Sequence, residues 1–255
     1  MKILYLNVNG FFGDSSIKKI LGENKMLPKV KDCREDGLNK IISRLLVDKL
    51  NSQKESYDMI FLSEIDSHSE ATREFKEKME NNNYTCILPN AVDEKSNVDE
   101  KFFSITVAFI KNEYLEEWLN NKKSNKSMET WLQICEIGCT SNKKILIAGL
   151  HVAKEEILND LQNTKEYNNK NFIIFGDFNL DFYDEENKED FKKIIENLSA
   201  EEVVDEEKKY TFRGKTKVDR VITKNVKDVT LRVDESYYTE GVSDHAALII
   251  DIEEP

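Results

Sequence analysis

The stretch that decides the fold reads Asn171-Phe172-Ile173-Ile174-Phe175-Gly176-Asp177-Phe178-Asn179. The apolar run from Phe172 to Phe175 predicts a buried strand. Because residues two apart in extended chain point the same way, we expect Asp177 and Asn179 to project side by side from the strand end. A carboxylate and an amide held there suit a water molecule and a phosphate oxygen. The alternative is a strand followed by an Asx turn, which occurs in any fold.

Apolar runs and their spacing predict about ten strands and four helices along the chain. The expected strands lie at residues 2–8, 58–63, 84–88, 103–110, 130–137, 145–152, 171–175, 218–223, 229–233 and 246–252. The expected helices span residues 35–50, 70–81, 154–167 and 186–198, and residues 11–36 are expected to form a long loop. Several strand pairs have no helix between them, which favours mixed sheets over a pure βαβ repeat. We therefore expect one α/β domain over residues 1–255, a four-layer sandwich of two packed mixed β-sheets flanked by helices.

The composition is that of an ordinary globular protein, with 255 residues of which 39% are hydrophobic. A formal net charge of −12 argues against a protein that coats nucleic acid without specificity, but it permits an enzyme with a local basic lane. No apolar run approaches the ~18 residues of a membrane span, so we expect no stable membrane insertion. Residues 1–12 are expected to form a first strand and not a signal peptide. Four cysteines without CxxC spacing predict reduced thiols and a cytoplasmic protein, which we expect to be a monomer.

Polar residues stand at the ends of the strongest predicted strands. Five clusters have this position, and a sixth polar residue lies inside a strand pattern. The clusters are Asn7 with Asn9, Glu64, His151, Asp177 with Asn179, and Asp244 with His245, and the sixth residue is Asp219. Each could have an ordinary role of its own, as a turn residue, a helix-entry charge or a structural histidine. Their joint occurrence at strand ends predicts one functional site.

The surroundings of Asp219 and His245 indicate how they are used. A charge inside a strand is costly unless it is paired, and a hydrogen bond from a histidine would satisfy Asp219 and fix the histidine tautomer. Asp244 and His245 are adjacent and would diverge on a regular strand. We therefore expect them in the turn before Ala246, where both side chains can face one site.

The ligand atoms of these clusters predict a hard metal ion. Glu64, Asp177, Asp244 and the two asparagines Asn7 and Asn9 offer oxygen only. Such a set suits Mg²⁺ or Mn²⁺, with water molecules completing the coordination shell. A zinc site would need closely spaced His and Cys residues, which this sequence does not have.

The motifs, taken in order, resemble those of the endonuclease/exonuclease/phosphatase superfamily over nearly the whole chain. They are Asn7-Val8-Asn9-Gly10, Leu62-Ser63-Glu64, Gly149-Leu150-His151, Gly176-Asp177-Phe178-Asn179, Val218-Asp219-Arg220 and Ser243-Asp244-His245. The first motif is similar to that of abasic-site endonucleases. The histidine motif is similar to that of pancreatic deoxyribonuclease and of the phosphodiesterase and sphingomyelinase branches. Two departures are Ser63, where many members have Gln, and an unusually long segment before the strand of Glu64, which can reshape substrate access.

The resemblance implies an enzyme, a metal-dependent phosphoric ester hydrolase. Glu64 would hold Mg²⁺ or Mn²⁺, and Asn7 and Asp244 would help directly or through water.

The resemblance also implies roles for the remaining polar residues. Asp177 would orient or deprotonate the attacking water, and Asn179 would hold a phosphate oxygen or the nucleophile. His245, paired with Asp219, would stabilise charge in the transition state. His151 would contact another phosphate oxygen or assist the leaving group.

A basic segment leads into Asp219 and bears on the substrate. Residues 208–224 read KKYTFRGKTKVDRVITK, a segment with a positive net charge in a chain whose net charge is negative. Its aromatic residues are interleaved with the cations, and nucleic-acid bases stack on aromatic rings. The residues expected to bind substrate are Asn9, Tyr210, Arg213, Lys215 and Lys217.

We therefore favour a nuclease that acts on DNA or RNA. Two alternatives stay open, because the basic segment can equally be a solvated hairpin. The first is a phosphoesterase for a small phosphate ester such as a phosphoinositide, a sphingomyelin-type headgroup or a nucleotide. The second is a non-enzymatic binding module on the same fold.

Overall fold

The computed structural model describes residues 1–11, 36–53, 56–66, 69–88, 105–115, 132–138, 144–152, 170–207 and 209–253, with the backbone alone for residues 132–138. The predicted helix at residues 154–167 lies outside the described residues, and so does the predicted long loop between Phe11 and Asp36.

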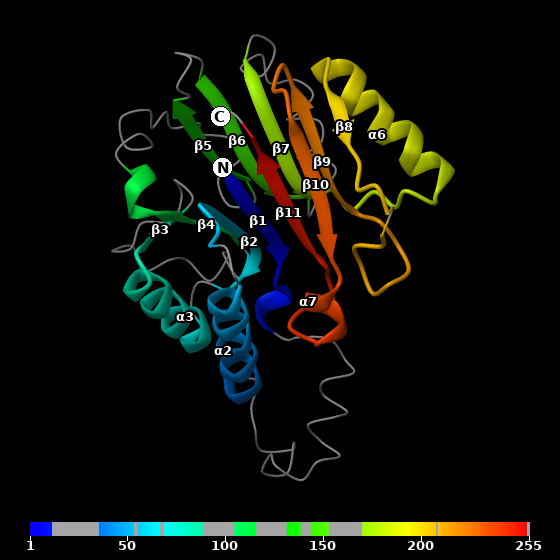
Figure 1. Ribbon diagram of the computed structural model, residues 1–255. Helices are drawn as coiled ribbons and strands as arrows, with labels where there is room; N and C mark the ends of the chain where they lie inside the picture. The colour runs from blue at the N-terminus through cyan, green and yellow to red at the C-terminus, as the bar shows by residue number, and fades with distance from the viewer. Residues whose placement is uncertain are drawn as a thin grey trace.

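Within these residues, eleven strands form two mixed sheets (Figure 1). The first sheet has the order β10-β11-β1-β2-β4-β3, and its strands are β1 (Lys2–Asn7), β2 (Met59–Ile65), β3 (Tyr84–Ile87), β4 (Ile105–Lys111), β10 (Val229–Asp234) and β11 (Ala247–Ile252). The second sheet has the order β5-β6-β7-β9-β8, and its strands are β5 (Leu132–Gly138), β6 (Lys144–His151), β7 (Asn171–Asp177), β8 (Glu201–Val203) and β9 (Asp219–Lys224). Each sheet contains one parallel pair, β1 with β2 and β6 with β7, and its other neighbours are antiparallel. The predicted mixed sheets are therefore confirmed.

A buried aromatic cluster joins the two sheets face to face. Tyr5 and Phe61 of the first sheet contact Phe175 of the second, with ring centroids 5.9 and 4.9 Å apart respectively. Near-perpendicular ring pairs at such distances are favourable beyond the area that they bury. A Cβ atom at Gly149 would lie 2.6 Å from the ring of Phe61, so glycine at this position lets the sheets approach.

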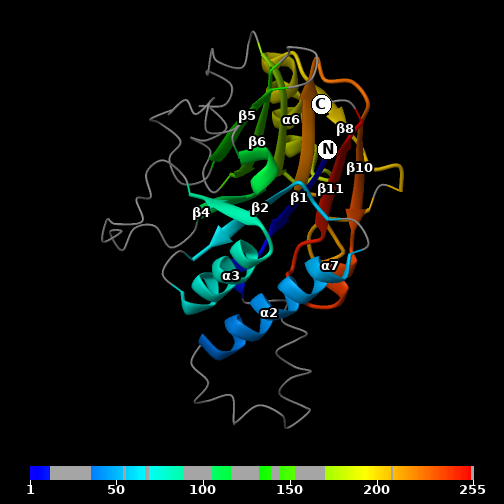
Figure 2. The same ribbon diagram turned by 60° about the vertical axis from the view of Figure 1, so that its left-hand side comes forward.

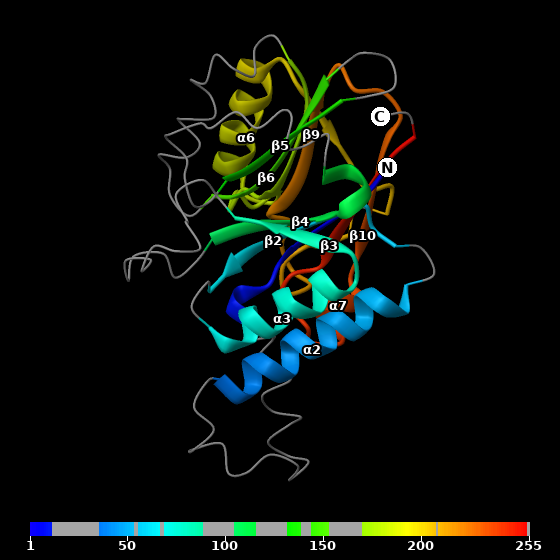
Figure 3. The same cartoon turned by 90° about the vertical axis from the view of Figure 1, so that its left-hand side faces the viewer.

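Helices cover the outer faces of both sheets and complete the four layers (Figure 2). The helices α2 (Asp36–Ser52) and α3 (Glu70–Asn81) pack against the first sheet, and α6 (Glu185–Leu198) packs against the second (Figure 3). Because alternate strand residues face opposite ways, Leu4 and Leu6 of β1 contact the helical layer while Tyr5 faces the second sheet. Among the described residues, no helix is long and apolar enough to cross a membrane.

The strand register brings the predicted polar residues to one end of the sandwich. The carboxyl ends of the parallel strands β6 and β7 meet at the same edge, where His151 lies beside Asp177. Asp219 opens the antiparallel strand β9 opposite Asp177. In the first sheet, Asn7 ends β1 next to the Ser63–Glu64 pair of β2. All of these strand ends therefore open onto the same side of the fold.

Three short elements are absent from the sequence-based prediction, and the first of them is the 3-10 helix η1 (Asn9–Phe11). Strand β8 has only three residues, Glu201–Val203, and its two glutamates hide the pattern of a strand. Helix α7 (Ser236–Thr239) is a single turn, too short for periodicity to detect. The predicted strand at residues 218–223 begins one residue later, so Asp219 stands at the end of β9 and not inside it.

Candidate active site

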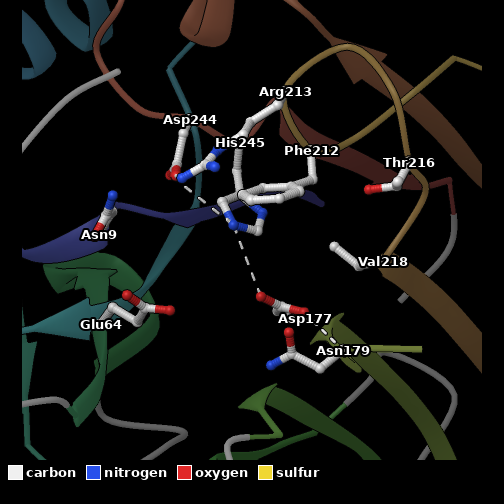
Figure 4. Close-up of a pocket in the computed structure, with 10 residues that line it drawn as sticks. All are labelled: Asn9, Glu64, Asp177, Asn179, Phe212, Arg213, Thr216, Val218, Asp244 and His245. Carbon is white, nitrogen blue, oxygen red and sulfur yellow. Dashed lines mark hydrogen bonds and ion pairs between the residues drawn. The ribbon is translucent and has the colours of Figure 1, made fainter. Parts of the chain in front are cut away.

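Most of the predicted polar residues surround one pocket of about 350 Å³ at the common end of the two sheets (Figure 4). The pocket is lined by Asn9, Glu64, Asp177, Asn179, Phe212, Arg213, Thr216, Val218, Asp244 and His245. Three further predicted residues lie directly behind this lining and contact it, namely Asn7, His151 and Asp219. The lining side chains of Phe212, Thr216 and Val218 are not among the residues predicted from the sequence.

A local break in β2 directs Glu64 into the pocket. The pairing of β2 with β4 shifts between Leu62 and Ile65, and Glu64 has a left-handed φ of 55°. An irregularity of this kind re-aims a side chain, and such strained positions are typical of functional sites. Glu64 Oε1 lies 3.1 Å from His151 Nε2 and accepts a 2.9 Å hydrogen bond from Asn7 Nδ2. Burial works to raise the pKa of Glu64, but these two hydrogen bonds, together with the charges of His151 and His245, hold the pKa below its ordinary value.

Asn7 acts here as a donor to two carboxylates. Its Nδ2 also donates to Asp177 Oδ2 at 3.1 Å, while its Oδ1 accepts the backbone N–H of Asn9 at 3.0 Å. The amide therefore holds Glu64 and Asp177 in place, and its oxygen is already used within the turn. Of the predicted metal ligands, the carboxylates of Glu64 and Asp244 are better placed than Asn7 to face a cation.

At Gly176 the backbone passes very close to the carbonyl group of Leu150, and Asp177 follows directly after this contact. Its φ is 144°, and a Cβ atom would lie 2.0 Å from the carbonyl oxygen of Leu150. The carboxylate of Asp177 follows in a nearly sealed position, with 2% of the residue exposed. Burial and the charge of Asp219 raise the pKa of Asp177 to about 6.

The chain turns sharply between Asp177 and Asn179. The Asn179 N–H donates to Asp177 Oδ1 at 2.8 Å, and Asn179 has a left-handed φ of 52°. Both expectations for this stretch are thus met in part, because the Asx turn exists and both side chains still line the pocket. Asn179 Nδ2 donates to the carbonyl of Val152 at 2.7 Å and lies 3.4 Å from His151 Nε2. The extended geometry expected between the two residues is wrong, since a turn separates them.

Asp219 and His245 form the expected pair. His245 Nδ1 lies 2.8 Å from Asp219 Oδ2, and both side chains are buried. Burial alone would lower the pKa of His245, but the charge of Asp219 and its hydrogen bond raise that pKa to about 9. His245 Nε2 points toward the pocket and lies 3.8 Å from Asp177 Oδ2 (Figure 4). A charged imidazolium is therefore available where a substrate anion would sit.

Residues with no predicted role hold this framework together. The hydroxyl of Tyr5 accepts the backbone N–H of Asp177 at 3.0 Å and lies 2.7 Å from Ser63 Oγ. Ser243 Oγ donates to the carbonyl of Asn7 at 2.5 Å and accepts the N–H of His245 at 3.0 Å. These bonds tie the turn before β11 to the end of β1. Ser63 thus has a structural contact of its own at the position where the sequence departs from the superfamily pattern.

Asp244 has one paired oxygen and one open oxygen. Arg213 Nη2 lies 3.1 Å from Asp244 Oδ2. Asp244 Oδ1 is buried, makes no hydrogen bond, and has His245 Nε2 4.0 Å away as its nearest ion-pair partner. A buried carboxylate oxygen without a hydrogen bond is costly unless a cation meets it.

The donor set fits a divalent cation. Four carboxylates converge on the site, those of Glu64, Asp177, Asp219 and Asp244, and ligand atoms of Glu64, Asp177 and His151 lie within 4.8 Å of one another. Glu64 and Asp244 present oxygen to the pocket, which suits Mg²⁺ or Mn²⁺. The open Oδ1 of Asp244 is the feature of this structure that a bound cation would satisfy.

The predicted substrate cations are not all at the pocket. Arg213 lines it, and Lys215 is exposed on the same turn. Lys217 is only 3% exposed, and its Nζ lies 3.6 Å from Glu202 and 5.3 Å from the ring centroid of Phe182. This geometry does not support Lys217 as a phosphate contact, because its charge is already paired in the interior.

Tyr210 is exposed and is not among the residues that line the pocket. The residue is 40% exposed, and its ring centroid lies 5.5 Å from that of Tyr183, a residue for which the sequence predicted no role. In the sequence, Tyr183 follows the Asp177–Asn179 turn and Tyr210 precedes Phe212, so each ring belongs to a segment that also carries a pocket residue. In the sequence, Tyr183 is marked by no more than its position shortly after the Asp177 motif.

Comparison with known proteins gives matches in structure alone. No protein-family model matches the chain, and no curated protein sequence matches it. An AP endonuclease from Leishmania major superposes with a TM-score of 0.60 at 13% identity, covering 100% of this chain and 88% of that one. A mannosyl-6-phosphatase from Bacteroides thetaiotaomicron gives a TM-score of 0.55 at 13% identity, with 98% of each chain covered.

A further similar structure carries the family name itself. An endonuclease/exonuclease/phosphatase family protein from Leptotrichia buccalis gives a TM-score of 0.53 at 16% identity, with 99% of each chain covered. Likeness at this identity concerns the arrangement of the backbone, and it agrees with the two packed sheets described above. The chain therefore has the fold of endonuclease/exonuclease/phosphatase proteins.

Proposed function

We propose that the protein is a divalent-metal-dependent phosphodiesterase whose preferred substrate is a nucleic acid. The observation that carries the proposal is the pairing of His245 with Asp219 directly above the buried carboxylate of Asp177. This arrangement supports a role for His245 as the cation that meets a phosphate oxygen and for Asp177 as the base for a water molecule. The fold shared with nucleases and phosphatases supports the same reaction class.

Asp177 is the best placed group to accept a proton from the attacking water. Burial raises its pKa to about 6, close to the pH at which a general base works best. Asn7 Nδ2 and the N–H of Asn179 hold its two oxygens, so the carboxylate is oriented before substrate arrives. Asn179 and His151 lie beside it and can hold the nucleophile or a non-bridging oxygen.

His245 supplies positive charge to the reacting phosphate. Its proton on Nδ1 is fixed by Asp219, which leaves an Nε2–H to donate into the pocket. A preorganised donor of this kind stabilises charge that develops in the transition state without reorganisation. A divalent cation held by Glu64 and Asp244 would supply Lewis-acid stabilisation of a phosphate oxygen.

Exposed cations at the pocket mouth favour a polyanionic substrate. Arg213 lines the pocket, and the exposed Lys215 and Tyr210 lie on the same segment, in a chain of formal net charge −12. Such cations contact phosphates that flank the scissile one, and an aromatic ring can stack on a base. That a similar structure is an AP endonuclease agrees with this substrate class.

A small phosphate ester is the second candidate. The burial of Lys217 removes one of the expected phosphate contacts, which leaves fewer cations for a long polymer. The similarity to a mannosyl-6-phosphatase is consistent with a small substrate.

The cytoplasmic location, the monomeric state and the single-domain organisation stay predictions from the sequence.

A substrate screen with a matched pair of variants tests the proposal. Purified protein is assayed with Mg²⁺ or Mn²⁺ on plasmid, single-stranded DNA, RNA, abasic DNA, phosphoinositides, sphingomyelin and a sugar phosphate. We expect hydrolysis of a nucleic acid, its loss in Glu64→Gln, and its retention in the exposed control Glu113→Gln. Turnover of a small ester alone would select the second candidate. Equal rates in Glu64→Gln and wild type on every substrate would contradict the metal-dependent site.

A further inference from the structure

Arg213 is held beside Asp244 by its backbone as well as its side chain. The Arg213 N–H donates to the carbonyl of Asp244 at 2.9 Å, and Arg213 Nη2 lies 3.1 Å from Asp244 Oδ2. The two contacts restrict the movement of Arg213 to different degrees. The backbone bond fixes where the side chain starts, whereas the guanidinium can leave the carboxylate while the Cα atom stays beside the site.

The turn that carries Arg213 is strained. Arg213 has a left-handed φ of 48° and is followed by Gly214 at 60°. A non-glycine residue in that region is strained and persists only where its surroundings impose it. Here Thr211 and Phe212 both donate to the carbonyl of Thr216, which closes the turn. These backbone bonds impose the left-handed conformation at Arg213.

The guanidinium lies at the border between the pocket and the solvent. Its carbon lies 4.7 Å from the ring centroid of Phe212, whose ring in turn packs 4.7 Å from that of His245. The Arg213 side chain is 59% exposed, whereas that of Asp244 is 6% exposed. The freed guanidinium would therefore be readily solvated, but its departure would leave the buried carboxylate of Asp244 with His245 Nε2, 4.0 Å from Oδ1, as its remaining cationic partner.

The single negative charge of Asp244 cannot neutralise both the guanidinium of Arg213 and a divalent cation at the same time. The exposed guanidinium meets Oδ2, and the pocket side of the carboxylate has the open Oδ1. A divalent cation on Asp244 would repel the guanidinium a few ångströms away and would supply the compensation that Arg213 gives in its absence. The arginine released in this way would stand at the mouth of a pocket suited to phosphate, for which its planar donors are well matched.

We propose that Arg213 and the divalent cation are alternative partners of Asp244, so that cation binding frees Arg213 to bind a substrate phosphate oxygen. This inference rests on the proposed function, because it takes Asp244 as a ligand of that cation. It differs from a role in which Arg213 orients Asp244 for the metal, since that role predicts the opposite effect on metal affinity.

Metal affinity in the absence of substrate distinguishes these roles. Protein freed of metal with EDTA and desalted is titrated with Mn²⁺ by isothermal titration calorimetry. A partly exposed ion pair contributes up to about 1 kcal/mol, so we expect Arg213→Gln to lower the Kd for Mn²⁺ about three- to fivefold. Arg213→Lys, which keeps the charge, should stay near the wild-type Kd.

Lys215→Gln is the matched control, because it removes the same charge from the same exposed turn without touching Asp244. In an Asp244→Asn background, Arg213→Gln should no longer change the Kd. An unchanged Kd in Arg213→Gln relative to Lys215→Gln, or a higher one, would overturn the proposal.

Binding of the substrate phosphate by the freed Arg213 is tested separately, through the KM. At saturating Mn²⁺, Arg213→Gln should raise the KM for bis-p-nitrophenyl phosphate several-fold, although the same variant binds Mn²⁺ more tightly. A general loss of structure would weaken both. Metal-dependent hydrolysis with an unaltered Kd in Arg213→Gln would overturn this inference alone, whereas no Mn²⁺ binding in any variant would overturn it together with the proposed function.

Discussion

The Asp219–His245 pair should make the stability of the metal-free protein depend on pH. Asp219, with smaller contributions from the charges of Asp177 and Asp244, raises the pKa of His245 from its ordinary value of 6.5 to about 9 in the folded state. The folded protein thus holds a proton that the unfolded chain releases near pH 6.5. At about 1.4 kcal/mol for each pH unit, the protonated pair stabilises the fold by about 3 kcal/mol. This contribution is fully present below pH 6.5 and is lost as the pH rises through 9.

The variant Asp219→Asn keeps an oxygen for His245 but removes the charge. We expect its free energy of unfolding to lie below that of wild type at pH 6.5, with a gap that narrows by up to about 3 kcal/mol by pH 9.5, because Asp177 and Asp244 still raise the pKa of His245 in the variant. The gap, and not either curve alone, is the measured quantity, because groups away from the site titrate equally in both proteins. Asp177 is an exception, since Asp219 contributes to its raised pKa of about 6, but most of its titration lies below this pH range.

Urea unfolding followed by circular dichroism, in EDTA at several pH values from 6.5 to 9.5, measures this gap. The same substitution in a His245→Gln background completes a double-mutant cycle and should give a gap that does not vary with pH. If the gap between wild type and Asp219→Asn were constant over this range, the charged pair would not exist in solution, and the proposed electrostatic role of His245 would lose its basis.

Three further predictions concern the metal, the backbone and the basic segment. Glu64→Gln and EDTA should each lower turnover by about two orders of magnitude or more with the fold intact, and full activity in EDTA would exclude the metal role. Gly176→Ala should lower stability by about 3 kcal/mol in urea unfolding, because its Cβ atom meets backbone at 2.0 Å, whereas Gly37→Ala has open space and should be neutral or slightly stabilising. Lys215→Gln should weaken nucleic-acid binding and flatten its salt dependence by about one unit of slope, whereas Lys217→Gln should lower stability and leave that slope unchanged.

The central strands were predictable because their signal is local. The run Phe172–Phe175 is apolar at every position, and in the structure β7 lies between β6 and β9 with both faces buried. The polar residue after such a run must lie at the sheet edge, so the position of Asp177 follows from the same signal. The His245–Asp219 hydrogen bond was predictable for a related reason, since a buried carboxylate needs a partner and few histidines were available.

The role of Lys217 was not predictable from the segment that contains it. The sequence shows Lys215 and Lys217 two residues apart among other cations, which suggests one solvated face. In the structure Lys215 is exposed, while Lys217 packs over Phe182 and pairs with Glu202 of β8. That pairing joins residues far apart in sequence, and β8 itself gives no recognisable pattern. Charge counts along a segment therefore overstate the number of cations that a substrate can reach.

The buried charges of the site bear on the reaction, whereas the exposed charges bear on which substrate binds. Asp177, Asp219 and His245 are almost fully enclosed, and their hydrogen bonds come from the ends of core strands and from backbone N–H groups. Their positions are set by folding and do not depend on what enters the pocket. The exposed charge at the pocket mouth belongs to the turn that carries Arg213 and Lys215, which ordinary side-chain motion can rearrange. Substitutions in this turn should therefore change which phosphoester binds while the pH dependence set by Asp177 and His245 is kept, whereas substitutions at the strand ends should remove hydrolysis of every substrate alike.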